Sequence, residues 1–380
     1  ALQRRGMHLL PLDPPGPRKD HGRPVPLAGI LLLPVLAAST VLCPAAGRPS
    51  LALAGLLAAA LVLRVAGTWS RSPDAVLVAS LLHAAAFALF ALWVWRSLDP
   101  PELAPLRRHL TLATGWLALA CLVEVALRWR ALGLPLPVPD LGGMRAVHAM
   151  GIFGGVAGWV VGVLLRAGPM FIAGWSVPSG IARAAPWLLA LGAATAAVGE
   201  ASRESAVARL GEFVALGGVG AIMLAGGALG RARRVLPMTA RSPEEARIFR
   251  LAAVSAGVAV PGGALAALLA WAGVPIHLLT DALRHLVTVG FLASVVVAMA
   301  FRLIPVLEGA ALPWPALRHV AFWALLASVL GRSAEVLVGV GGRGIAPLVP
   351  LSGLLAWIAL ACVAANLAGA IARLRGAPPA

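Results

Sequence analysis

The chain has 380 residues, of which 60% are hydrophobic, and its mean hydropathy is +0.90. This composition excludes an ordinary soluble globular domain. The formal net charge of +16 does not indicate a nucleic-acid partner, because every basic residue except Lys19 is an arginine and most lie in loops or at helix ends. Arginines in such positions anchor and orient membrane helices.

Residues 1–26 are basic and rich in proline, which predicts an N-terminal arm that builds no core of its own. From residue 27 onward, windows of about 20 apolar residues recur, the length that a helix needs to cross a bilayer. They predict an all-α fold, a polytopic transmembrane helical bundle of about eleven spans, with a range of about ten to twelve. The expected spans are 27–45, 51–68, 75–97, 109–131, 145–167, 185–201, 208–230, 250–273, 282–303, 317–340 and 347–374.

Prolines near residue 100 and a long basic loop after residue 230 divide the expected spans into three groups. Residues 27–105 hold three spans, whereas residues 107–235 and 247–375 hold four each. An even number of helices in each repeat makes the repeats parallel, so that equivalent helices run in the same direction. We therefore expect tandem parallel four-helix repeats, with 27–105 as an incomplete third copy.

A succession of histidine, glycine, arginine and proline occurs twice in the chain. The first copy consists of His148, Gly154, Arg166 and Pro169, and the second of His285, Gly290, Arg302 and Pro305. Histidine and arginine are 18 residues apart in the first copy and 17 in the second. A helix rises about 1.5 Å per residue, so the two groups mark opposite faces of the membrane. We expect both arginines to be anchors that extend toward the membrane surface.

Three histidines fall in the first third of spans that are predicted to run in the same direction, namely His83, His148 and His285. They could therefore share one layer of the membrane. Histidine inside a bilayer is costly and needs a partner. Imidazole ligates haem iron and also suits copper. The alternative is a hydrogen bond to a neighbouring helix, and both interpretations stay open.

The remaining histidines of the apolar region are expected near the membrane surface. His277 could complete a metal site in which Asp281 orients an imidazole, or it could be an interfacial cap. His109 and His319 follow arginines at the starts of helices on the opposite face, which favours interfacial positions.

Acidic residues inside the spans are expected to pair with arginine. Glu124 precedes Arg128 by four residues and Arg332 precedes Glu335 by three, and both spacings allow contact on one helix face. Glu212 lies near the start of a span, where it could deliver protons.

The segment RHLVTVGFLASVVVAMAFRLIP, with His285, Thr288 and Gly290, resembles a late helix of the NnrS family. His148 is similar to the corresponding histidine of the preceding repeat, and the resemblance covers about the last 240 residues. More distantly, the parallel repeats resemble subunit I of haem–copper oxidases and nitric oxide reductases. The chain departs from these patterns because residues 27–45 contain no histidine and the whole sequence contains no tyrosine. The tyrosine of the oxidase active site is therefore excluded.

The NnrS resemblance implies a bacterial inner-membrane protein that contains haem b, and also copper, and that acts in nitric oxide metabolism or nitrosative stress. It implies cofactor ligands at His148 and His285, to which the shared layer adds His83. For a metal ion, the expected set is His148, His285 and His277. The implied partners are the lipid bilayer and proteins of electron transfer or nitric oxide metabolism, and whether the protein is an enzyme stays open.

Two other classes of function are compatible with the same residues. The first is a carrier or permease of parallel repeats that couples protons or substrate through intramembrane histidines. The second is a non-catalytic assembly subunit in which the histidines are structural.

Overall fold

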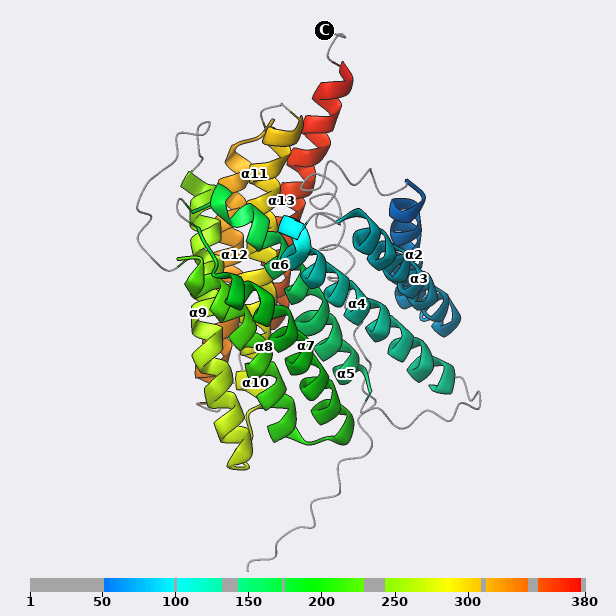
Figure 1. Cartoon of the computed structure of the whole chain (residues 1–380), viewed down its shortest axis with the longest axis vertical. Coiled ribbons are helices and arrows are strands. Elements are labelled where there is room, and N and C mark those ends of the chain that lie inside the picture. Colours follow the sequence, from blue (N-terminus) through cyan, green and yellow to red (C-terminus); the bar gives the residue numbers. More distant parts are fainter. Residues whose placement is uncertain are drawn as a thin grey trace, which may run out of the picture.

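A computed structural model describes residues 51–98, 101–131, 143–172, 175–228, 243–308, 312–340 and 348–376. Every regular element in these ranges is a helix, as expected for an all-α protein (Figure 1). The α-helices are α2 (Leu51–Trp69), α3 (Pro73–Ser97), α4 (Ala104–Ala131), α5 (Met144–Ala149), α6 (Ala157–Ala167), α7 (Ser179–Ser202), α8 (Ser205–Ala225), α9 (Pro243–Trp271), α10 (His277–His285), α11 (Ser294–Glu308), α12 (Ala316–Val340) and α13 (Leu348–Gly376). A π-helical segment, Met150–Val156, joins α5 to α6, and another, Leu286–Ala293, joins α10 to α11. Short 3-10 turns cover Pro101–Leu103 and Gly168–Met170.

Eight helices of the described part are long and apolar enough to cross a membrane, judged by length and composition. Two of these eight are the continuous rods Met144–Ala167 and His277–Arg302, each of which includes a π-helical segment. All of the spans expected from the sequence fall on helices, except 27–45, which lies outside the described residues together with the arm at 1–26. The helices α2 and α12 occupy two expected spans but are not among the eight.

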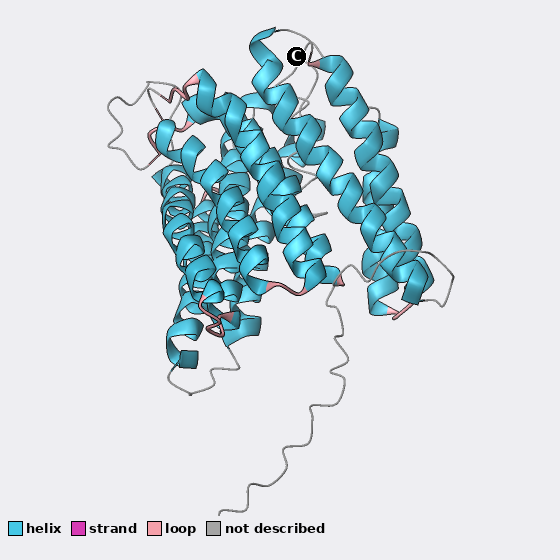
Figure 2. Ribbon diagram, turned by 60° about the horizontal axis from the view of Figure 1, so that its bottom comes forward, coloured by secondary structure: helices cyan, strands magenta, loops and turns pink. Residues whose placement is uncertain are grey.

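Helices that follow one another in the chain mostly pack side by side, as α2 does with α3, α3 with α4, α7 with α8, and α12 with α13. Figure 2 shows the resulting bundle, in which loops appear only at the ends of helices. The outward faces are apolar, with Trp69 at 89%, Trp271 at 82% and Leu268 at 69% exposed. Large apolar side chains on an outer surface indicate a lipid environment rather than water. The protein is therefore a multi-pass membrane protein.

The tightest helix pair, α7 and α8, is packed through glycine. A Cβ atom on Gly211 would lie 2.2 Å from the backbone nitrogen of Ala196, and one on Gly199 would lie 2.2 Å from that of Ala208. Small residues allow membrane helices to approach this closely. This contact fixes the position of α7 and α8, which carry the acidic residues described below.

Candidate functional site

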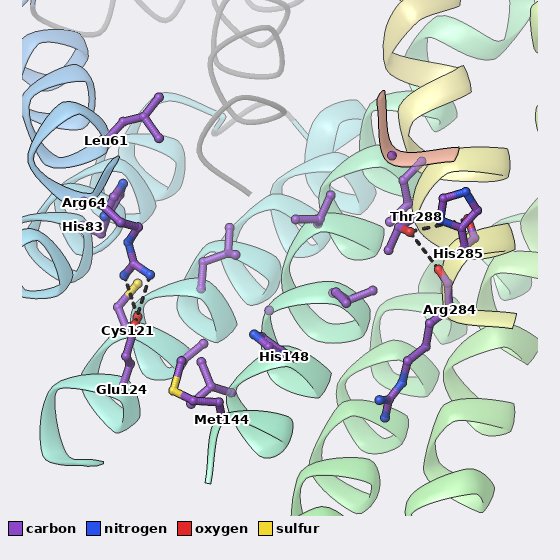
Figure 3. Close-up of a pocket in the computed structure, with 18 of the residues that line it drawn as sticks. Leu61, Arg64, His83, Cys121, Glu124, Met144, His148, Arg284, His285 and Thr288 are labelled. Carbon is purple, nitrogen blue, oxygen red and sulfur yellow. Dashed lines mark hydrogen bonds and ion pairs between the residues drawn. The ribbon is translucent and has the colours of Figure 1, made fainter. Parts of the chain in front are cut away.

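A cavity of about 370 Å³ opens between the N-terminal helices and the second half of the bundle. His83 from α3, His148 from α5 and His285 from the end of α10 all line it (Figure 3). Most of the wall is apolar, with Phe87 and Leu117 among its residues. Its volume lies within the range of small-molecule sites, about 300–1,000 Å³. The histidines that the sequence singled out as cofactor ligands thus meet at one cavity.

The three histidines lie along the cavity and do not converge on one point. Figure 3 shows His148 between a group around Arg64 and His83 and a second group around Arg284 and His285. Within the described ranges, no group of three histidine, cysteine, aspartate or glutamate residues could hold a metal ion.

His277 does not join the other histidines. It is exposed at the start of α10 and does not line the cavity. Asp281, which was expected to orient an imidazole, instead forms an ion pair with Arg332. The structure therefore does not assemble the expected metal set of His148, His285 and His277.

Both histidine helices change to π-helical geometry immediately after the histidine. The segment Met150–Val156 starts two residues after His148, and Leu286–Ala293 starts one residue after His285. Such insertions are rare and occur frequently at functional sites. Each segment contains the glycine of the repeated succession, Gly154 or Gly290. A Cβ atom on Gly154 would lie 2.6 Å from the Trp116 ring, and one on Gly290 would lie 2.5 Å from the Ser255 hydroxyl.

At one end of the cavity, two arginines share one buried carboxylate. Arg64 donates to Glu124 from both terminal nitrogens, at 3.1 Å and 2.5 Å, and to the Ser80 hydroxyl at 2.9 Å. Arg128 donates to the same carboxylate at 2.8 Å and 2.9 Å, which confirms the pair expected from their spacing. Arg64 was not recognised from the sequence, because its partner lies 60 residues away on another helix.

On the other side, Arg284 connects the cavity to two buried acids. It donates to Glu212 at 2.7 Å and 3.0 Å and to Glu200 at 2.6 Å. Arg209 contacts the same two carboxylates, at 2.7 Å for Glu212. Two arginines and two glutamates make this cluster balanced in charge. Glu212, expected to deliver protons, is held in salt bridges in this structure.

His285 is held by a short hydrogen-bonded chain. Its Nε2 lies 3.1 Å from Oγ of Ser328, and this hydroxyl donates to the carbonyl oxygen of Ser352 at 2.7 Å. A serine hydroxyl has only one proton to donate. Because that proton goes to Ser352, Ser328 accepts from His285, and Nε2 carries a hydrogen.

Four residues outside the cavity were expected at the membrane surface. His109, expected at the membrane interface, is 1% exposed. Arg302, expected to be a surface anchor, is buried, and its guanidinium lies 3.8 Å from Glu245. The expectation for Arg302 was wrong, because distance along a helix indicates depth in the membrane but not which face meets a neighbour. The burial of His109 shows that it packs against neighbouring helices and leaves its expected depth in the membrane a prediction. Arg166 and His319 are exposed.

Arg332 was expected to pair with Glu335, whose side chain lies outside the described residues. In the structure it contacts Asp281, which is 51 residues away.

Compared with known proteins, the chain matches no family model, no curated protein and no solved structure. Any function must therefore be argued from the cavity and from the residues around it.

Proposed function

We propose that this chain is an NnrS-type bacterial inner-membrane protein that binds haem b in the three-histidine cavity and takes part in the response to nitric oxide. The observation that carries the proposal is that His83, His148 and His285, which belong to helices far apart in the sequence, line one cavity inside the bundle. When bound, haem supplies an iron centre that can take a diatomic gas as a ligand.

His148 is the residue best placed to ligate the iron. It lies between the two polar groups of the cavity, and it forms no hydrogen bond within the described part of the chain. His285 fits less well, since its Nε2 already donates to Ser328. His83 is 5% exposed, and its ring stacks on Phe87 with centroids 5.9 Å apart. The proposal therefore assigns ligation to His148 and a supporting role to the other two.

The proposal does not extend to copper, because no group of three possible metal ligands comes together among the described residues. It does include the parallel four-helix repeats expected from the sequence. The two π-helical segments support such a repeat, since each follows a histidine and contains the equivalent glycine, Gly154 or Gly290.

The test is the haem content of the full-length protein purified in mild detergent from cells with ample haem supply. We expect equimolar haem in the wild type and in His319→Ala, which removes an exposed histidine on α12. His148→Ala should lose most of the haem while the protein remains monodisperse. Wild-type protein of normal stability without haem would contradict the proposal.

A second function, a proton-coupled carrier, is favoured by one specific observation. Carriers place their binding sites at irregular helices near the middle of the membrane. The π-helical segments beside His148 and His285 are irregularities of this kind. Flux of substrate or protons in reconstituted vesicles, lost in His285→Ala and measured in haem-free protein, would favour the carrier.

A further inference from the structure

Among the described residues, the end of the cavity near His83 has more arginines than carboxylates. Arg64 and Arg128 both pair with Glu124, so two cations share one anion. The exposed fractions of the side chains are 11% for Arg64, 2% for Glu124 and 24% for Arg128, so the Arg64–Glu124 pair is the more deeply buried. A net charge inside a membrane protein is costly unless a partner of opposite sign balances it.

Hydrogen-bond donors at this end also remain available. An arginine has five N–H groups, and the three hydrogen bonds of Arg64 to Glu124 and Ser80 engage three of them. Within the described residues, the Nε–H and one N–H of the NH1 nitrogen form no hydrogen bond. His83 lines the same end of the cavity, and its side chain is 5% exposed. Arg64, with two unused N–H groups, and His83 therefore meet at one wall of the cavity.

We propose that Arg64 and His83 form a binding subsite for a small monovalent carboxylate or similar planar oxyanion. The bidentate face of the Arg64 guanidinium is filled by Glu124, and each of its two spare N–H groups can donate one charge-assisted hydrogen bond to an anion oxygen. The anion would balance the charge that Glu124 leaves over. This inference does not depend on haem, because the same oxygen pair could belong to a free anion or to a carboxylate of a bound cofactor.

The experiment is equilibrium dialysis of radiolabelled formate against the detergent-purified full chain at constant ionic strength. We expect saturable, equimolar binding by the wild type. Arg64→Gln should weaken it about tenfold or more, since a charge-assisted hydrogen bond is lost. Arg96→Gln is the matched control, because this arginine is exposed on the helix that carries His83 and does not line the cavity.

Glu124→Gln separates binding from folding. It removes the carboxylate that competes with the anion for Arg64, so formate affinity should rise while stability falls. A purely structural role for the Arg64–Glu124 pair predicts that both substitutions reduce binding or leave it unchanged. Absence of saturable formate binding by the wild type, or a fall in affinity in Glu124→Gln, would overturn the proposal.

The same measurement on haem-free and haem-loaded protein distinguishes the two sources of the anion. Formate bound in both preparations indicates a free anion as the natural ligand. Formate bound only without haem indicates that a carboxylate of the cofactor fills the subsite. Binding in neither contradicts the subsite, whereas the presence or absence of haem itself is read independently from the absorption spectrum.

Discussion

His285 and Ser328 are joined by a hydrogen bond of 3.1 Å between Nε2 and Oγ, and His285 is the donor. The direction follows from the bond of Ser328 to the carbonyl of Ser352. Because Nε2 is the imidazole nitrogen that usually reaches a metal, this bond holds His285 away from ligation. In the proposed haem site, Ser328 therefore gives His285 a different role from that of His148.

Replacing Ser328 by alanine should release Nε2 of His285. In haem-loaded protein we expect the haem spectrum of Ser328→Ala to differ from that of the wild type, because the His285 imidazole beside the cavity is no longer held by Ser328. The loss of one hydrogen bond should cost about 1 kcal/mol of stability. The matched control is Ser333→Ala, since the Ser333 hydroxyl bonds only to the Val329 carbonyl of its own helix.

The absorption and electron paramagnetic resonance spectra of both variants provide the measurement. A Ser328→Ala spectrum identical to that of Ser333→Ala would show that His285 does not approach the iron.

Arg209 should be essential for the stability of the bundle. Its side chain is 7% exposed and contacts Glu200 and Glu212. Arg209→Gln leaves two buried carboxylates to Arg284 alone, and removing one partner of a buried ion pair costs about 3–5 kcal/mol. Arg183→Gln on the exposed face of α7 should change stability by less than about 0.5 kcal/mol.

The free energy of unfolding of detergent-solubilised protein compares these variants. Equal stability of Arg209→Gln and Arg183→Gln would contradict the assignment of the cluster as a structural support of the cavity wall.

Two glycines of α8 should respond in opposite ways to alanine. Gly211→Ala places a methyl group 2.2 Å from the backbone of α7, and we expect a cost of about 1–3 kcal/mol from overpacking. Gly217 has no neighbour within 4 Å of the added Cβ, so Gly217→Ala should be neutral or stabilise by about 0.5–1 kcal/mol. Thermal unfolding followed by tryptophan fluorescence measures both, and a Gly211→Ala variant as stable as Gly217→Ala would refute the close contact of α7 and α8.

The sequence predicted what depends on local composition. Apolar windows located the helices, because burial in lipid requires a long uninterrupted apolar run. The depth of a residue follows from its distance along such a helix, and this was enough to group His83, His148 and His285, which line one cavity.

What the sequence could not predict depends on how helices face each other. Arg284 was overlooked although it adjoins His285, because its partners Glu212 and Glu200 lie 72 and 84 residues away. His109 follows two arginines and was expected at the interface. It is buried because its Cβ packs where Gly162 leaves room, at 2.7 Å from the position of an added Cβ.

The most direct test of the account is a reduced-minus-oxidised absorption spectrum of the full chain, purified with ample haem, in three forms. We predict a Soret band and split visible bands for the wild type and for His319→Ala. The same bands should be largely absent in His148→Ala of comparable yield. A wild type without these bands, or a His148→Ala variant that keeps them at full strength, would contradict haem ligation in the three-histidine cavity.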